Sequence, residues 1–162
     1  MAIAISSIGA KVSFAFETEA GTRPDTGYTK LPGIKEIPEM NPTPDTLETT
    51  SMDNLEYRTY IDGLKDLGGA LAFTANFTQE LYNLYNDPTT GIIKKWDEAK
   101  LAGKAMWLCI DINGLDKSCY LSVTPSKLGM PAASVNSVLE VSLYFTPAGE
   151  PLWDADPKAY TA

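Results

Sequence analysis

Five stretches of the chain alternate apolar and polar residues with a period of two, the pattern of β-strands that bury one face. The clearest spans residues 69–77, where large apolar side chains such as Phe73 alternate with small, uncharged ones such as Thr74. The other four segments are 11–17, 105–112, 118–124 and 135–146. Strands of this kind must share an apolar core, so the sequence predicts a protein dominated by antiparallel sheet.

Two helices are predicted in the middle of the chain, at 78–87 and 91–102. Thr78 can cap the first helix, because its hydroxyl can accept a hydrogen bond from a free amide of the first turn, and Pro88 follows the end of that helix. With strands before and after these helices, the predicted class is α+β. The expected architecture is an antiparallel sandwich or barrel with a helix packed on the sheet, a long loop and extended terminal arms.

The remaining segments are long and polar. Prolines interrupt the region before residue 51, so only two short strands, at 34–40 and 45–50, are predicted there. Residues 51–69 have no sustained apolar period and predict a long loop with little structure of its own. Residues 19–33 predict a loop or an extended arm. The predicted organisation is one domain over residues 1–162, with a long loop at 41–68 and a C-terminal arm at 147–162.

Charge and composition exclude several classes of protein. The chain has 21 acidic and 13 basic residues, and its net charge of −8 argues against a surface that grips phosphate groups. No run of apolar residues is long enough to predict a membrane-spanning helix, and the N-terminal stretch lacks the basic region of a signal peptide. Cys109 and Cys119 match no zinc or redox motif. Two buried thiols are expected, and a disulfide across a hairpin is the alternative.

The search for catalytic or metal-binding chemistry gives a negative expectation. The chain has no histidine, which removes the commonest general base and metal ligand, so a serine triad in its usual form is excluded. Four acidic residues of the long loop could bind a hard cation, but the EF-hand pattern is absent and Arg58 and Lys65 interleave with them. They are Asp53, Glu56, Asp62 and Asp66. A solvated or intersubunit loop is favoured, and no catalytic residue, metal or cofactor is predicted.

Four polar segments carry the residue patterns that suggest a family. They are Leu31-Pro-Gly-Ile-Lys-Glu-Ile-Pro38, Pro44-Asp-Thr-Leu-Glu-Thr-Thr-Ser51, Tyr60-Ile-Asp-Gly-Leu-Lys-Asp-Leu-Gly-Gly69 and Thr146-Pro-Ala-Gly-Glu-Pro151. In these segments, and in the order of its strands and helices, the chain resembles the tail tube (major tail) proteins of long-tailed bacteriophages. The resemblance extends over residues 8–153.

The resemblance implies a structural subunit and not an enzyme. Members of the family form six-subunit rings that stack into a hollow tube with a continuous inner β-barrel. The tube forms around a tape-measure protein, meets tail terminator and tail-tip proteins, and later conducts genomic DNA without binding it specifically. The implied location is the virion tail, after assembly in the host cytoplasm. Two alternatives stay open: a secretion-system-type tube protein, and a capsid-decoration or carbohydrate-binding β module that does not polymerise.

Two sets of residues are hypothesised to act in assembly and transport. The small polar faces of the strands are expected to line the channel, because a lumen should let a polyanion pass and not hold it. The proposed lining is Glu48, Thr74, Asn76, Thr124, Glu140 and Ser142. The long loop is expected to reach the adjacent ring. Its proposed contact residues are Asp53, Glu56, Tyr57, Arg58, Tyr60, Asp62 and Asp66.

Overall fold

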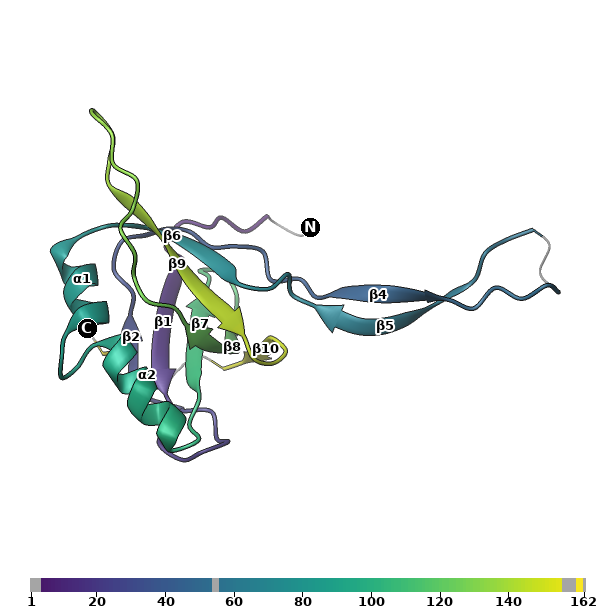
Figure 1. Ribbon diagram of the computed structural model, residues 1–162, viewed down its shortest axis with the longest axis horizontal. Coiled ribbons are helices and arrows are strands. Elements are labelled where there is room, and N and C mark those ends of the chain that lie inside the picture. The colour runs from purple at the N-terminus through teal and green to yellow at the C-terminus, as the bar shows by residue number, and fades with distance from the viewer. Residues whose placement is uncertain (1–3, 54–55, 156–159, 162) are drawn as a thin grey trace.

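One large sheet carries the fold in the computed structural model, which describes residues 4–53, 56–155 and 160–161 (Figure 1). Its strands are β1 (Lys11–Phe16), β2 (Tyr28–Lys30), β3 (Ile34–Glu36), β6 (Leu71–Asn76), β7 (Met106–Asp111), β8 (Ser118–Pro125), β9 (Glu140–Pro147), β10 (Leu152–Asp154) and β11 (Tyr160–Thr161). The order across the sheet is β11-β2-β1-β7-β8-β9-β6-β3, and β10 also pairs with β8. Neighbouring strands are antiparallel except for β11 and β2. The predicted antiparallel α+β class is therefore confirmed.

Two helices lie between β6 and β7, as predicted. They are α1 (Gln79–Asn86) and α2 (Ile92–Leu101). The Thr78 hydroxyl accepts a hydrogen bond from the Leu81 amide at 3.2 Å and so caps α1. At the other end of α1, the Asp87 carboxylate accepts hydrogen bonds from the amides of Thr89 and Thr90 at 2.8 and 3.0 Å. These bonds turn the chain toward α2, and they lower the pKa of Asp87 to about 2.

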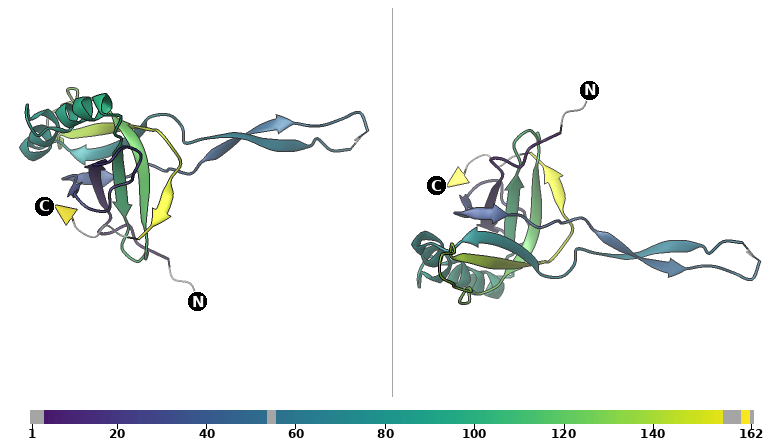
Figure 2. Two further views of the ribbon diagram at one scale, coloured as in Figure 1. Left: turned by 90° about the horizontal axis from the view of Figure 1, so that it is seen from below. Right: turned by 90° about the horizontal axis from the view of Figure 1, so that it is seen from above.

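The main core lies between the inner face of the curled sheet and the two helices (Figure 2). Alternate residues of β6 are buried as the period of two predicts, with Phe73 and Ala75 inaccessible to solvent. The Phe73 ring meets the Phe145 ring of β9 edge-on, with centroids 5.5 Å apart. Leu81 of α1 and Ile92 of α2 close the core from the helical side. Burial of this one continuous cluster is the main force that holds the sheet and helices together.

A second, smaller cluster buries part of the outer face of the sheet. Its members are Ala15, Tyr28, Cys109 and Tyr120, with Trp107 packed against them. The prediction that residues 11–17 form a half-buried strand is therefore wrong, because β1 is buried on both faces. Cys109 belongs to this cluster, whereas Cys119 faces the main core. Both cysteines are buried thiols, as the favoured prediction states. Because their side chains lie on opposite faces of the sheet, they cannot form a disulfide without rearrangement.

The segment predicted as a structureless loop at 51–69 contains a strand. Strand β5 (Tyr60–Asp66) pairs with β4 (Thr43–Glu48) in a separate two-stranded sheet. Sequence periodicity missed β5 because nearly all of its residues are exposed, so no alternation of burial marks it. Pro44 is tolerated in β4 because both strands of a two-stranded sheet are edge strands.

The boundaries of other strands also differ from the prediction. Residues 19–33 contain β2, which pairs with β1. Strand β9 begins at Glu140 and not at 135, because Val135 and Val138 are exposed and belong to a projecting loop, residues 126–139. Within the described part of the predicted C-terminal arm, β10 pairs with β8.

Candidate assembly surfaces

The β4–β5 hairpin projects far from the rest of the molecule (Figure 1). We call residues 41–68 the arm. Its strands pair from Thr43 opposite Asp66 to Glu48 opposite Tyr60. The ladder continues toward the tip, where the Thr49 amide donates to the Thr59 carbonyl at 2.7 Å. In the described part of the chain, these two strands form a sheet only with each other.

The arm leaves apolar side chains in solvent. Leu47 and Ile61 lie directly opposite each other on one face, and they are 54% and 56% exposed. Met52 near the tip and Leu64 in β5 are exposed further still. An isolated two-stranded hairpin is marginally stable in water and needs a third strand, a helix or a partner to pack against. A surface of this kind marks a site of interaction with another protein.

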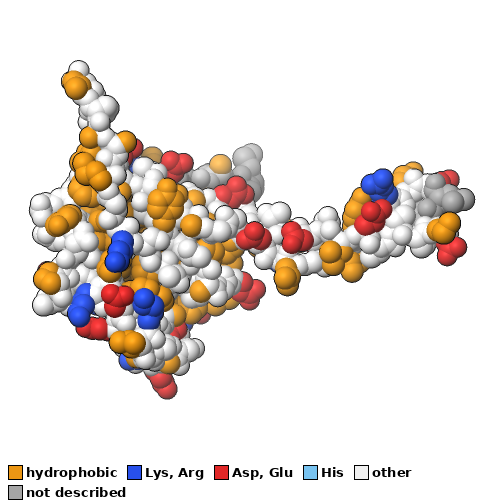
Figure 3. Space-filling model, viewed as in Figure 1, with side chains coloured by type: hydrophobic (Ala, Val, Ile, Leu, Met, Phe, Trp, Pro, Cys, Tyr) orange, Lys and Arg blue, Asp and Glu red, His pale blue; other side chains and the backbone are white. Residues whose placement is uncertain are grey.

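The arm holds all of the residues predicted to contact the next ring. Tyr60, Asp62 and Asp66 lie in β5, and Asp53, Glu56, Tyr57 and Arg58 lie toward the tip. Six acidic and two basic residues make the arm negative overall, and both acidic and hydrophobic side chains are visible along it (Figure 3). The Arg58 Nε lies 3.8 Å from the Glu48 carboxylate, an exposed pair that contributes little stability. The described residues contain no group of three or more acidic or cysteine side chains able to hold a metal ion.

Five of the six residues predicted to line a channel gather on one surface. Thr74 lies opposite Ser142 and Asn76 opposite Glu140 on β6 and β9, and Thr124 lies on the adjoining end of β8. All five belong to the outer face of the sheet, away from the main core. The sixth, Glu48, lies on the arm in a different sheet. The structure therefore does not bring Glu48 together with the other five.

This part of the outer face has few charges, and they are of both signs: Glu36 lies opposite Thr74, and Lys127 lines a hollow together with Ser142 and Tyr144. Besides the five predicted residues it carries small or polar side chains such as Ala72 and Thr146, which continue the same faces of β6 and β9. Glu140 forms an exposed ion pair with Lys35, which compensates its charge. We call this surface the bare face; it comprises Ala72, Thr74, Asn76, Thr124, Glu140, Ser142, Tyr144 and Thr146. A surface with so little charge offers a polyanion no site to bind.

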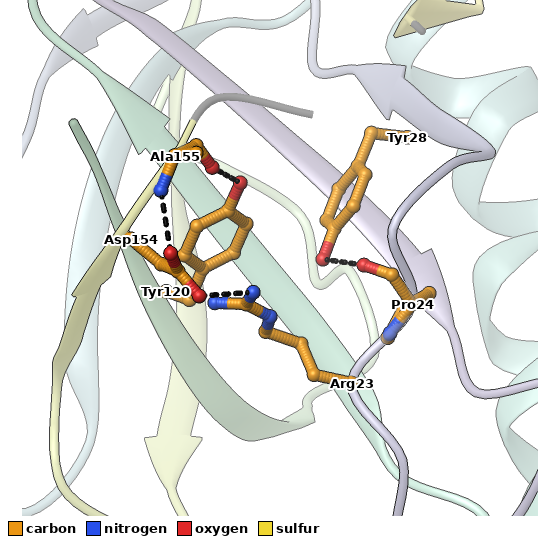
Figure 4. Close-up of polar contacts among 6 residues, drawn as sticks. All are labelled: Arg23, Pro24, Tyr28, Tyr120, Asp154 and Ala155. Carbon is orange, nitrogen blue, oxygen red and sulfur yellow. Dashed lines mark hydrogen bonds and ion pairs between the residues drawn. The ribbon is translucent and has the colours of Figure 1, made fainter. Parts of the chain in front are cut away.

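The other part of the outer face is covered by the chain itself (Figure 4). The Arg23 guanidinium lies 4.0 Å from the centre of the Tyr120 ring and donates a hydrogen bond of 2.6 Å to the Asp154 carboxylate. The Tyr120 hydroxyl donates to the Ala155 carbonyl at 2.6 Å, and the Tyr28 hydroxyl donates to the Pro24 carbonyl at 2.9 Å. These contacts tie β10, which pairs with β8 in the sheet, to the loop before β2. The covered part differs from the bare face in that its tyrosines, Tyr28 and Tyr120, are buried, whereas Tyr144 of the bare face is 48% exposed.

Sequence reasoning missed this clamp of Arg23, Tyr120 and Asp154. Arg23 and Asp154 are separated by 131 positions, and neither belongs to a motif. The pKa of Asp154 is lowered by hydrogen bonds from the Ala155 amide and Arg23 and by the charge of Arg23. The one residue that could have indicated the clamp from local sequence was Tyr120. It is a large aromatic residue on the strand face that was expected to be polar.

Removing the clamp should loosen the C-terminal strand without unfolding the domain. In an Arg23→Met variant, the aliphatic stem remains but the ion pair and the cation–π contact are lost. We expect the amides of β10 to exchange hydrogen at least tenfold faster, while amides of β6 and β7 keep their protection. Hydrogen–deuterium exchange measured by mass spectrometry checks this, with Lys30→Met as a control for loss of charge. Equal exchange of β10 in wild type and Arg23→Met would contradict the assigned role.

Comparison with known proteins identifies the fold but no close relative. No family model and no curated protein matches the sequence. Three cryo-electron microscopy structures share the fold. A chain of the anti-feeding prophage baseplate, 6-fold symmetrised, matches with a TM-score of 0.65 and 14% identity, over 98% of this chain and 100% of that chain. The sheath/tube terminator of an extracellular contractile injection system in its extended state matches with a TM-score of 0.58 and 13% identity, over 95% and 99% of the two chains.

The third structure is the tube-terminating cap of the anti-feeding prophage, which matches with a TM-score of 0.55 and 12% identity over 96% of this chain and 93% of that chain. Similarity over nearly the whole length of each chain shows that the arm, sheet and helices form one shared fold. At these identities the likeness extends to the fold alone. Among the described residues, no helix is long and apolar enough to cross a membrane.

Proposed function

We propose that this chain is a structural subunit of a tail tube, in which stacked rings of identical copies form a hollow channel for genomic DNA. The observation that carries the proposal is the arm: a hairpin with exposed aliphatic side chains that projects from a fold shared with parts of contractile injection particles. Such an arm has a clear use in a subunit that contacts several neighbours. Rings of six copies, as the family resemblance implies, are part of the proposal.

The arm is proposed to bridge adjacent rings. Burying Leu47 and Ile61 against another copy would remove apolar surface from water, at about 25 cal/mol per Å². The contact would be heterologous, since the arm of one copy meets a different surface of the next. Contacts of this type close into rings or propagate as filaments. Other copies of the chain are therefore the first proposed partners, and tape-measure, tail terminator and tail-tip proteins are the others.

The bare face is proposed to line the channel. Its side chains are mostly small and polar, and the charges around it are balanced in sign, with Glu36 and Glu140 against Lys35 and Lys127. Such a surface would let DNA slide past without specific binding. Neighbouring copies would complete the sheet around the lumen, which would leave no strand edge open to aggregation. The proposed location is the tail of the virion, with assembly in the host cytoplasm.

A second function is favoured by the particles to which the similar structures belong. These structures are a baseplate component, a sheath/tube terminator and a tube-terminating cap, all from contractile injection particles or related prophage. A ring component of such a particle would use the same fold and arm, would form a single ring in place of a long tube, and would conduct a different cargo. No catalytic role is proposed in either case.

The state of association distinguishes the two proposals. Sedimentation velocity of the purified chain at increasing concentration should show a steep transition from monomer to large, polydisperse assemblies if the chain forms tubes. A discrete ring that does not grow further would favour the terminator-like or baseplate-like function. A monomer at every concentration and salt condition would contradict both.

Positive charge on the bare face should slow transport without preventing assembly. Ser142 is exposed and lies opposite Thr74, so a Ser142→Lys variant would place an ammonium group in the proposed lumen. A ring of such charges attracts phosphate groups, and we expect DNA ejection from otherwise normal particles to slow severalfold, most strongly at low salt. Asn86→Lys, on the exposed surface of α1, is the matched control. Normal ejection kinetics in Ser142→Lys particles would remove the lining assignment.

A further inference from the structure

An apolar pocket opens at the base of the arm. It has a volume of about 760 Å³. Its walls come from several segments far apart in the sequence, and the apolar ones include Ile37, Met40, Leu67, Ile112, Pro151 and Trp153. Ile37, Met40, Leu67 and Ile112 also pack against the main core, so the pocket is an open side of that core. A cavity of this kind loses packing energy unless another side chain fills it.

The projecting loop, residues 126–139, has the complementary character. Met130, Val135 and Val138 are 85%, 91% and 67% exposed, and residues 128–139 contain no charged side chain. The loop leaves the body as a second projection, on a different side from the arm (Figure 1), and hydrophobic side chains are visible along it (Figure 3).

The tip of this loop has a defined shape. The Ser137 hydroxyl donates to the Ser134 carbonyl at 2.9 Å and lies 2.7 Å from the Ser134 hydroxyl. Between them, Asn136 takes a positive φ of 61°, which a short polar residue tolerates at a tight turn. A turn with its own hydrogen bonds loses less conformational entropy on binding than a disordered segment.

Charge distinguishes the loop from the arm as the occupant of the pocket. Glu39 and Glu150 both line the pocket, against one basic residue, Lys65. The arm is acidic, so its insertion would bring carboxylates next to Glu39 and Glu150 and leave them unpaired. Residues 128–139 of the loop carry no charge and bring no such cost. Of the two projections, only the loop matches the pocket in both polarity and charge.

We propose that the projecting loop of one copy docks into the apolar pocket of another copy, with Val135 among the side chains that enter it. The inference rests on the proposed self-assembly, and it adds a second contact between copies that is independent of the arm. Because loop and pocket are different surfaces of the same chain, the contact is heterologous and each copy can use both at once.

Engineered cysteines test the contact in the assembled full-length protein. The variant carrying both Met40→Cys and Val135→Cys should form a ladder of covalent oligomers on mild oxidation, since each chain can link to two others. The single variants Met40→Cys and Val135→Cys should give dimers at most. Cys119 is buried but lines this pocket, so every variant is made in a Cys119→Ser background. A ladder from Met40→Cys with Leu47→Cys, and none from Met40→Cys with Val135→Cys, would make the arm the occupant and overturn the proposal.

A charge substitution provides an independent readout. Val135→Glu would bring a carboxylate to Glu39 and Glu150, and we expect assembly to require at least tenfold more protein, whereas Val135→Leu should assemble like wild type. The melting temperature of the monomer should not change, because Val135 is almost fully exposed. Assembly of Val135→Glu at wild-type concentration would contradict the docking contact while leaving the proposed function intact. Failure of the wild-type chain to assemble would contradict both.

Discussion

Replacing residues 44–65 with an Asn-Gly turn is expected to give a folded protein that no longer assembles. Thr43 and Asp66 are register partners, so a two-residue turn can join them without disturbing the chain on either side. The arm forms its own two-stranded sheet and the large sheet does not include it. We therefore expect the melting temperature to shift by no more than a few degrees, while large assemblies disappear from sedimentation and light-scattering profiles.

A double substitution tests the apolar contact of the arm while the arm itself stays in place. Leu47→Glu with Ile61→Lys keeps a cross-strand pair of opposite charge and so preserves the hairpin, but it removes the aliphatic pair. It should assemble as poorly as the shortened chain. Thr46→Lys, which places a basic side chain opposite the unchanged Asp62 on the opposite face of the same hairpin, is the matched control. Wild-type assembly by the shortened chain would show that the arm is not an assembly element.

Glu17→Ala is expected to cause a large loss of stability for a single substitution. The Glu17 side chain is only 6% exposed, and it accepts hydrogen bonds from the Gly21 amide at 2.9 Å, the Ala105 amide at 3.2 Å and the Trp107 indole at 2.9 Å. It joins the turn after β1 to the start of β7. The substitution would leave three donors without their acceptor, and each unsatisfied buried donor costs about 1–3 kcal/mol. We expect a total loss of about 3 kcal/mol in the free energy of unfolding, measured by urea denaturation.

The same carboxylate predicts a dependence of stability on pH. Burial raises the pKa of Glu17, but the hydrogen bonds from Trp107, Gly21 and Ala105 outweigh burial and hold the pKa below its ordinary value of 4.5. A pKa lowered in the folded state stabilises the fold above the pKa of the unfolded state and loses that contribution as pH falls through the folded pKa. The stability difference between wild type and Glu17→Gln should be full at pH 7 and shrink below about pH 4.5. A difference that stays constant down to pH 3 would contradict this assignment.

The sequence predicted the elements whose signals are local. Thr78 and Pro88 mark the ends of the first helix, and the alternation around Phe73 identifies both the strand and its buried face. These features depend on residues a few positions apart, so a single sequence contains them. The same alternation correctly predicted that five of the six proposed lining residues share one surface.

What the sequence did not predict depends on contacts between distant segments. Glu48 was grouped with the sheet because β4 carries no mark of its separate pairing with β5. The second cluster needs Tyr28 and Tyr120 together, and the clamp needs Arg23 beside Asp154. The pocket at the base of the arm has walls from segments spread along the chain, so no local pattern reveals it. The projecting loop did carry one feature visible in the sequence, since residues 128–139 contain no charged side chain.

Electron microscopy of the purified wild-type chain at high concentration tests the central claim most directly. If copies of the chain complete one another's sheets around a channel, images should show rings in end view and stacked, hollow filaments in side view. Class averages should then resolve an arm that crosses from each ring to the next. Particles that remain compact monomers under every assembly condition, with no ring or filament, would contradict the account.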